Sequence, residues 1–123
     1  MKFYICKHCG NLILMVKDSG VNPVCCGEAM TELLPGTVDA AVEKHVPVFE
    51  IQGNTVKVKV GSVEHPMTKE HLIDFIAIET TNGSQIKHLT ADMKPEAEFN
   101  LAEGEKLVAV YEHCNIHGLW KAE

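Results

Sequence analysis

The pattern of apolar and polar residues between positions 47 and 60 predicts a β-hairpin. Residues 55–60 read Thr-Val-Lys-Val-Lys-Val. Because side chains alternate between the two faces of a strand, the valines share one face and the lysines the other. Residues 47–52 form a second run, and Gly53-Asn54 lies between the two runs as a typical hairpin turn. One face of this hairpin is therefore expected to enter a hydrophobic core.

Further strands are predicted downstream, and together they indicate a sandwich. Residues 72–80 are apolar and rich in β-branched side chains, and Asn82-Gly83, a strong hairpin signal, joins them to residues 85–90. Residues 106–113 predict a last strand. Short strands at regular spacing with turn signals favour a mainly β fold. We expect an immunoglobulin-like antiparallel β-sandwich over residues 37–123.

The first 36 residues have a different character. Four glycines punctuate them, and they hold too few apolar residues for a core of their own. A fold of fewer than about 40 residues usually needs a metal ion, disulfides or oligomerisation. Pro35-Gly36 is a turn signal, so we expect a separate module over residues 1–36. A short helical turn is expected next, over residues 38–44 with Thr37 as its N-cap.

Four of the five cysteines lie in this module, in a pattern typical of a metal site. Cys6 and Cys9 form a Cys-x-x-Cys turn followed by glycine, and Cys25 and Cys26 follow as an adjacent pair. Four thiolates match a tetrahedral site for zinc or iron, and the spacing alone favours neither metal. Adjacent side chains on a strand point to opposite faces, so Cys25 and Cys26 can share an ion only where the backbone turns sharply. The alternatives are four free cysteines or a zinc clip without chemistry.

Charge and composition exclude several classes of partner. The 123 residues carry a formal net charge of -6 and include no arginine. Nucleic-acid binding depends on neutralising phosphates, and anionic membrane surfaces attract basic segments, so we expect neither partner. No apolar run approaches the roughly 20 residues that span a bilayer, and the apolar part of residues 1–6 is too short for a secretory leader. An odd number of cysteines suits no disulfide framework, and we expect a cytoplasmic protein.

The fifth cysteine belongs to a second group of candidate ligands. Cys114 and His117 are two residues apart, so that one turn can present both side chains to an ion. His65 and His71 can reach the same ion only from a loop that folds back, which Pro66 is well placed to start. A zinc site would be complete with fewer ligands, so this group points to iron with one position left open.

The histidines divide between this group and bystanders. The candidate ligands of the second site are His45, His65, His71, Cys114 and His117. The remaining histidines are interpreted as ordinary surface or core residues: His8, which is expected to face solvent, His88 and His113.

The motifs in this order carry a specific resemblance. They read CKHCG and VCCGEAM near the start, TVDAAVEKHVPV and KVKVGSVEHPMTKEH in the middle, and EHCNIHGLW near the end. The sequence resembles the desulfoferrodoxin family, the two-iron superoxide reductases, along essentially the whole chain. The middle and final motifs are far more specific than a lone Cys-x-x-Cys, and no metal ligand of the pattern departs from it.

The resemblance implies a role for each candidate residue. The module over residues 1–36 would be desulforedoxin-like, and the domain over 37–123 would be the superoxide reductase domain. A distorted rubredoxin-like iron would be held by Cys6, Cys9, Cys25 and Cys26, a site that zinc can also occupy. A catalytic iron would be held by His45, His65, His71 and His117 in its equatorial plane, with Cys114 as the axial thiolate.

The residues around the catalytic iron also receive roles from the resemblance. Glu43 would close onto the oxidised iron, and Lys44 would guide and stabilise the incoming anion. The backbone amides of Ile116 and His117 would point at the Cys114 sulfur and tune it. The implied activity is the one-electron reduction of superoxide to hydrogen peroxide without release of dioxygen. A rubredoxin-like protein would supply the electron, and the chain would form a homodimer.

The same residues are also compatible with two other functions. A β-sandwich with Cys-x-x-His near its end is similar to a copper electron-transfer protein. Such a site uses two histidines, one cysteine and a weak axial methionine, but no methionine follows His117, and His65 and His71 would have no role. A protein with purely structural zinc is the other alternative.

Overall fold

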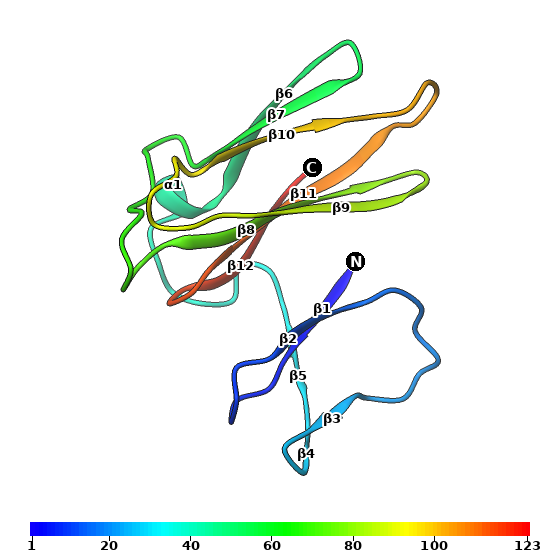
Figure 1. The fold of residues 1–123 in the computed structure, drawn as a ribbon, viewed down its shortest axis with the longest axis vertical. Helices are drawn as coiled ribbons and strands as arrows, with labels where there is room; N and C mark the ends of the chain where they lie inside the picture. The colour runs from blue at the N-terminus through cyan, green and yellow to red at the C-terminus, as the bar shows by residue number, and fades with distance from the viewer. The chain divides into compact units, whose positions relative to one another are not determined.

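The computed structural model describes residues 1–123 and divides the chain into two units, Met1–Leu34 and Pro35–Glu123 (Figure 1). The division falls at the Pro35-Gly36 turn signal, just before the boundary that we expect after residue 36. Each unit has its own sheets.

Met1–Leu34 is a small module built from five short strands. Its strands are β1 (Lys2–Ile5), β2 (Leu12–Met15), β3 (Val24–Cys25), β4 (Glu28–Ala29) and β5 (Thr31–Leu33). The strands pair antiparallel as a sheet of order β2-β1-β5 and a separate β3-β4 pair. Its own hydrophobic cluster consists of three buried residues, Tyr4, Cys6 and Met30. So small a core is weak, as the sequence indicated.

Pro35–Glu123 is a β-sandwich, as the strand pattern predicts. One sheet has the order β10-β7-β6 and the other the order β12-β11-β8-β9, and every pairing is antiparallel. The strands are β6 (Pro47–Gln52), β7 (Thr55–Val60), β8 (Ile73–Thr80), β9 (Gly83–His88), β10 (Glu96–Asn100), β11 (Leu107–Cys114) and β12 (Gly118–Ala122). The mainly β fold class is confirmed.

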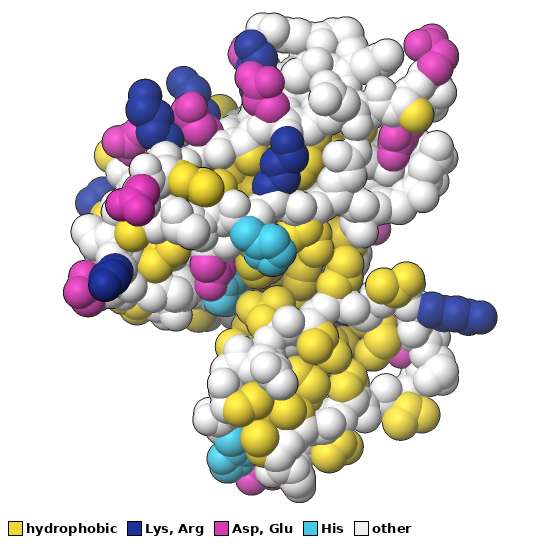
Figure 2. Space-filling model, viewed as in Figure 1, with side chains coloured by type: hydrophobic (Ala, Val, Ile, Leu, Met, Phe, Trp, Pro, Cys, Tyr) yellow, Lys and Arg dark blue, Asp and Glu magenta, His cyan; other side chains and the backbone are white.

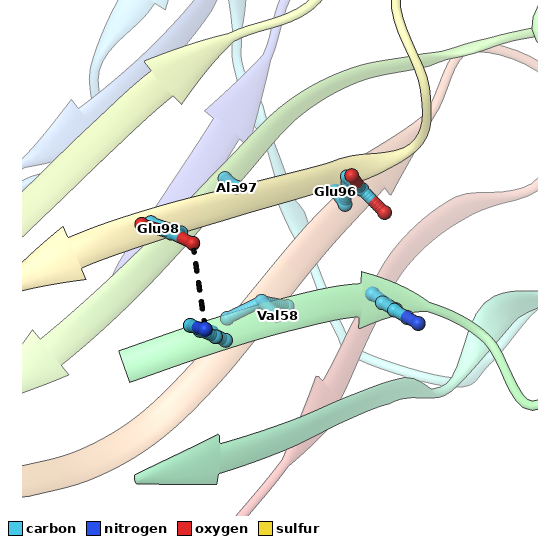
Figure 3. Close-up of a pocket in the computed structure, with 6 residues that line it drawn as sticks. Val58, Glu96, Ala97 and Glu98 are labelled. Carbon is cyan, nitrogen blue, oxygen red and sulfur yellow. Dashed lines mark ion pairs between the residues drawn. The ribbon is translucent and has the colours of Figure 1, made fainter. Parts of the chain in front are cut away.

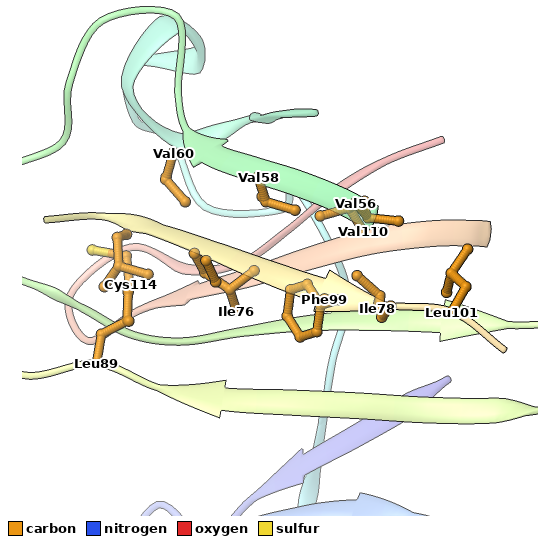
Figure 4. Packing of buried hydrophobic residues seen from close by; sticks show 12 residues of the cluster. Val56, Val58, Val60, Ile76, Ile78, Leu89, Phe99, Leu101, Val110 and Cys114 are labelled. Carbon is orange, nitrogen blue, oxygen red and sulfur yellow. The ribbon is translucent and has the colours of Figure 1, made fainter. Parts of the chain in front are cut away.

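The core of the sandwich lies between these two sheets (Figure 4). Val56, Val58 and Val60 are at most 1% exposed and form its β7 side, which confirms the alternation in residues 55–60. Phe99 enters from β10. Full burial of an aliphatic or aromatic side chain stabilises the fold by about 1.5–3 kcal/mol. At one end of the core, Cys114 from β11 is fully buried among these residues.

Three features of the structure differ from what the sequence predicts. Residues 106–113 are not the last strand, because β12 follows them and pairs with β11. Strand β10 was not predicted, since only Ala97 and Phe99 mark its buried face. The helical turn is shorter than expected: α1 spans Val42–His45, and its N-cap is Ala41, which makes no side-chain cap hydrogen bond, not Thr37.

The outer face of the β10-β7-β6 sheet carries paired charges. Lys57 lies opposite Glu98 and Lys59 opposite Glu96 in the strand register, and the Lys57 Nζ and Glu98 Oε1 atoms are 3.9 Å apart. These side chains line a groove (Figure 3), and none of the predicted metal ligands is among its lining residues. On the face that Figure 2 shows, basic and acidic side chains of this sandwich lie interspersed. Such cross-strand pairs support the sheet.

The only helix, α1, has four residues, so the structure contains no helix with the length and apolarity to cross a membrane.

Candidate metal centres

The four cysteines of the N-terminal module form one tight cluster. Their sulfur atoms all lie within 4.8 Å of one another, with 3.6 Å between the Cys9 and Cys25 sulfurs and 4.0 Å between those of Cys25 and Cys26. Cys6 and Cys9 follow β1, and Cys25 ends β3. The structure thus brings the predicted cysteines of this site together.

The left-handed backbone conformation of Cys26 allows the neighbouring residues Cys25 and Cys26 to serve the same site. Cys26 has a φ of 53°, and Gly27 after it has a φ of 76°. A non-glycine residue with positive φ is uncommon, and here it turns the chain so that the Cys25 and Cys26 sulfurs face the same centre. This is the sharp turn that the sequence requires for a shared ion.

The pKa values of two of these thiols are shifted in opposite directions. The backbone N–H of Cys9 donates to the Cys6 sulfur at 3.5 Å and lowers the pKa of Cys6 to about 6. The contact with Cys9 raises the pKa of Cys26 to about 12. Four sulfurs this close cannot all be thiolates unless a cation lies among them, so the donor set fits a zinc or iron ion.

The second candidate site collects four residues from three parts of the sandwich. His45 ends α1, His65 and His71 lie on the loop between β7 and β8, and Cys114 ends β11. One donor atom from each of these four residues lies within 4.8 Å of the others. The loop after β7 folds back, as we expect from Pro66, and brings both of its histidines to the same centre.

Hydrogen bonds fix the tautomers of two of these histidines. The Nδ1–H of His45 donates to the Ala41 carbonyl oxygen at 2.7 Å, and the Nδ1–H of His65 donates to the Pro66 carbonyl oxygen at 2.7 Å. In a neutral ring, the other nitrogen is then an acceptor. The Nε2 atoms of the two rings are 3.1 Å apart. Both are acceptors, so their lone pairs face each other, and a cation bound between them would satisfy both.

His117 completes the group from the turn after β11. Its Nδ1 atom is 3.1 Å from His45 Nε2 and 3.8 Å from the Cys114 sulfur. The Nε2 atom of His71 is buried and has no hydrogen-bond partner. Unsatisfied buried nitrogens around one point, next to a buried thiol, are what a thiolate–imidazole metal site requires. The donor set fits an iron ion.

Burial keeps the imidazoles neutral. It is the main cause that lowers the pKa of His45 and His71, and it lowers the pKa of His65 to about 4. The positive charge of Lys44 further lowers the pKa of His45 and His71. A metal ion requires neutral imidazole ligands, so the site provides them ready at neutral pH.

The Cys114 thiol responds to two opposing influences. Burial raises its pKa, whereas hydrogen bonds from the backbone N–H groups of His117 and Ile116 lower it. The His117 N–H lies 3.4 Å from the sulfur. These amides stabilise a thiolate once a cation replaces the proton.

Glu43 and Lys44 lie next to His45 on α1, and both side chains are exposed. Neither contributes an atom to the donor cluster. Lys44 directly precedes His45 in the chain, and its positive charge is one of the lesser causes that lower the pKa of His45 and His71. None of the predicted bystanders is among the grouped donors. His8 pairs with Glu28 at 3.0 Å, His113 bonds Asp74 Oδ1 at 2.8 Å, and His88 is exposed.

Two residues near the second site are not predicted from the sequence. Trp120 stacks on the His45 ring with centroids 5.1 Å apart, and its Nε1–H donates to the His117 carbonyl oxygen at 3.0 Å. Glu112, two positions before Cys114, is fully buried without a hydrogen-bond partner. Burial raises the pKa of Glu112 to about 9, so its carboxyl is neutral at pH 7. Both residues lie in the segment EHCNIHGLW, but the sequence alone does not show which residues they contact.

Comparison with known proteins identifies the family. The desulfoferrodoxin family profile matches residues 37–123, which is most of the chain. The chain belongs to the desulfoferrodoxin family. The desulfoferrodoxin of Clostridium acetobutylicum is 42% identical over 124 residues, which cover 100% of this chain and 96% of the relative. That of Nitratidesulfovibrio vulgaris is 47% identical over 122 residues, 99% of this chain and 95% of the relative.

A solved structure supports the same assignment. The superoxide reductase from Treponema pallidum has a TM-score of 0.83 and 41% sequence identity, and the match covers 98% of both chains. The similarity of this chain to the solved structure therefore includes the N-terminal module as well as the sandwich.

Proposed function

We propose that this chain is a superoxide reductase. The observation that carries the proposal is the cluster of buried, mutually facing donor atoms from His45, His65, His71 and Cys114, with His117 beside them. The similarity to a superoxide reductase of known structure supports it. In the reaction, superoxide takes up one electron from the site and two protons from solvent and becomes hydrogen peroxide, and no dioxygen forms.

The two donor groups would each hold one iron. Cys6, Cys9, Cys25 and Cys26 are the ligands that we propose for the first, where zinc can substitute, and the four histidines and Cys114 are those for the second. An iron ion bound to the second group supplies the exchange of one electron with superoxide. The copper and structural-zinc alternatives are less favoured, because five donors converge on one centre.

The protein's own residues prepare this centre. The carbonyls of Ala41 and Pro66 hold the His45 and His65 rings with their acceptor nitrogens inward. The backbone amides of His117 and Ile116 stabilise the negative charge on the Cys114 sulfur. Fixed ligands of this kind need no rearrangement during electron exchange.

Lys44 and Glu43 have roles at the approach to the centre. The protein has a net charge of -6, which repels an anionic substrate at long range. The exposed Lys44 amine offers a local attractive charge next to a ligand, and such a charge raises the rate of encounter. Glu43, beside it, is the carboxylate that we propose to approach the oxidised site and assist release of the product.

Product stoichiometry tests the reaction. Iron-loaded protein with a chemical reductant is given superoxide, and hydrogen peroxide and dioxygen are measured together. A reductase yields one peroxide per superoxide and no dioxygen. Dismutation yields half as much peroxide together with an equal amount of dioxygen and would refute the proposal, as would no consumption of superoxide. A His71→Asn variant should lose the activity, and the matched His88→Asn variant, at an exposed histidine outside the cluster, should keep it.

The proposal also includes an electron donor, an oligomeric state and a cellular compartment. One-electron chemistry requires an external donor, and we propose a rubredoxin-like protein. We further propose a homodimer in the cytoplasm. Stopped-flow mixing of oxidised protein with a reduced rubredoxin tests the donor, and sedimentation equilibrium tests the dimer. Failure of transfer on the time scale of turnover, or a monomer at micromolar concentration, would contradict these two parts.

A further inference from the structure

Asn115 joins the two segments that supply ligands to the second site. It lies between Cys114 and His117, yet three of its groups bond to the loop that carries His71. Its Oδ1 accepts from the Leu72 N–H at 2.9 Å, and its Nδ2 donates to the Glu70 carbonyl oxygen at 3.0 Å. Its backbone N–H donates to the Leu72 carbonyl oxygen at 3.1 Å. The residues on both sides of His71 are therefore held by one asparagine.

His71 needs this support more than His45 and His65 do. The rings of His45 and His65 are each held by an Nδ1–carbonyl hydrogen bond. The His71 ring has no such bond, and its Nε2 atom is buried without a partner. The His71 backbone N–H bonds only within the loop, to Thr68. The position of the ring relative to Cys114 thus depends on how its backbone is attached to the end of β11.

A side-chain amide is chemically suited to this attachment. It offers one acceptor and two donors, and here it bonds the carbonyl before His71 and the N–H after it, much as a neighbouring strand would. Leucine has a similar size but neither polar group. Removal of the amide would leave the Glu70 carbonyl and the Leu72 N–H without these partners, and the loop would be free to shift.

We propose that Asn115 is a positioning residue that sets the His71 imidazole at the metal centre. It does not touch the metal or the substrate, and it acts through the backbone at Glu70 and Leu72. The inference rests on the proposed function only in taking the second donor group as a metal site. Partners that orient metal ligands typically account for 10-fold to 100-fold in metal affinity, and we expect Asn115 to fall in that range.

Cobalt(II) binding to the full chain tests this role without any measurement of activity. The d–d absorption bands of cobalt report the number and type of its ligands. The variants are Asn115→Leu, His71→Ala as a reference for a lost imidazole, and Asn100→Leu as a matched control. Asn100 is an exposed asparagine whose Oδ1 accepts a bond from the Thr55 hydroxyl at 3.3 Å. Cobalt in the four-cysteine cluster cancels in difference spectra between variants.

The expected results separate positioning from general stability. Asn115→Leu should bind cobalt at least ten-fold more weakly at the histidine site, with its bands shifted toward those of His71→Ala. Asn100→Leu should match the wild type in affinity and spectrum, even where it loses thermal stability. If Asn115→Leu loses stability but keeps the wild-type spectrum and affinity within two-fold, the role is refuted and the asparagine is merely structural.

A second variant covers a failure of Asn115→Leu to fold. Asn115→Ser is too short to bond both Glu70 and Leu72 but leaves room for water, and it should show the same weaker binding. A wild-type affinity in Asn115→Ser would overturn the inference. Wild-type protein that binds cobalt normally but does not reduce superoxide when loaded with iron would instead refute the proposed function and leave the Asn115 result standing.

Discussion

Gly61 lies so close to the backbone of Glu43 that a Cβ atom on Gly61 would be 2.5 Å from the Glu43 carbonyl oxygen. The same oxygen accepts hydrogen bonds from the Val63 N–H at 2.9 Å and from the Ser62 hydroxyl at 3.3 Å. The chain just after β7 therefore supports the segment that presents Glu43 and Lys44. Any side chain at position 61 must displace that segment.

We expect Gly61→Ala to change the site more than its effect on stability would suggest. The new methyl group would push the backbone of Glu43 and Lys44 away, and His45 follows directly. The superoxide rate constant should fall about ten-fold, and metal affinity should fall with it. Stopped-flow kinetics and metal titration measure both.

Gly53→Ala is the control for that substitution. Gly53 lies in the turn at the other end of the same hairpin, with a φ of 61° and nothing near its Cβ position. Alanine there costs about 1 kcal/mol through backbone strain but should leave the rate constant unchanged. Equal kinetic losses in the two variants would show that Gly61 contributes only to stability.

Lys44→Ile should slow the encounter with superoxide. Because the protein is acidic, loss of the local positive charge should lower the second-order rate constant about ten-fold at low salt and flatten its dependence on ionic strength. Pulse radiolysis at several salt concentrations measures this. Lys106→Ile removes the same charge from an exposed position outside the site and should change the rate little. An unchanged rate in Lys44→Ile would rule out the role proposed for this lysine.

The pH dependence of stability should carry a contribution from Glu105. Its carboxylate accepts hydrogen bonds from the Thr80 hydroxyl and from the Ala102 N–H at 2.9 Å, and these lower its pKa from the ordinary value of 4.5. The folded state thus binds the proton less tightly than the unfolded state. The contribution is fully present above about pH 4.5 and is lost as the pH falls through the lower folded pKa.

Glu105→Gln should therefore be less stable than the wild type at pH 7, and the difference should shrink below pH 4.5. Urea unfolding between pH 7 and pH 3.5 measures the difference in the free energy of unfolding. Glu103→Gln, an exposed change in the same turn, should show no such trend. A difference that stays constant with pH would contradict the assignment of the lowered pKa to these hydrogen bonds.

Removal of metal should affect the two units unequally. Met1–Leu34 has a hydrophobic cluster of only three buried residues, so a metal ion among its sulfurs supplies much of its stability. The sandwich has a large apolar core. After chelation, amide signals from residues 1–34 should lose their dispersion in NMR spectra, while those of β7 and β11 keep theirs. Retained dispersion in both units would show that the module does not depend on its ion.

The sequence predicts the sandwich where alternation is strong and fails where it is weak. Strands β6 and β7 begin and end at the predicted residues, because residues 55–60 alternate strictly and Gly53-Asn54 marks the turn that joins them to residues 47–52. Strand β12 contains only Leu119 and Trp120 as buried residues. It forms because it pairs with the edge of β11 that β8 does not occupy. Thr37 does not cap a helix, since the chain there follows a different path and Gly36 N–H bonds to the Leu119 carbonyl oxygen at 2.8 Å.

The candidate ligands are easier to predict than the residues that hold them. Cysteines and histidines at a recognisable spacing indicate a metal site from the sequence alone, and the structure brings the donors of each site together. Asn115 and Trp120 act through contacts to residues such as Leu72 and His45, which the sequence alone does not place beside them. Their roles follow only once the strands are paired.

The separation of the two donor sets has a consequence for metal analysis. All four sulfurs of the first cluster come from Met1–Leu34, and every donor of the second comes from Pro35–Glu123. No residue is shared, so filling one site does not require the other to be filled. With iron in the histidine site, as we propose, zinc in the four-cysteine cluster would use none of the iron's ligands. We therefore expect activity to follow the iron content of the histidine site alone, whatever metal the four cysteines hold.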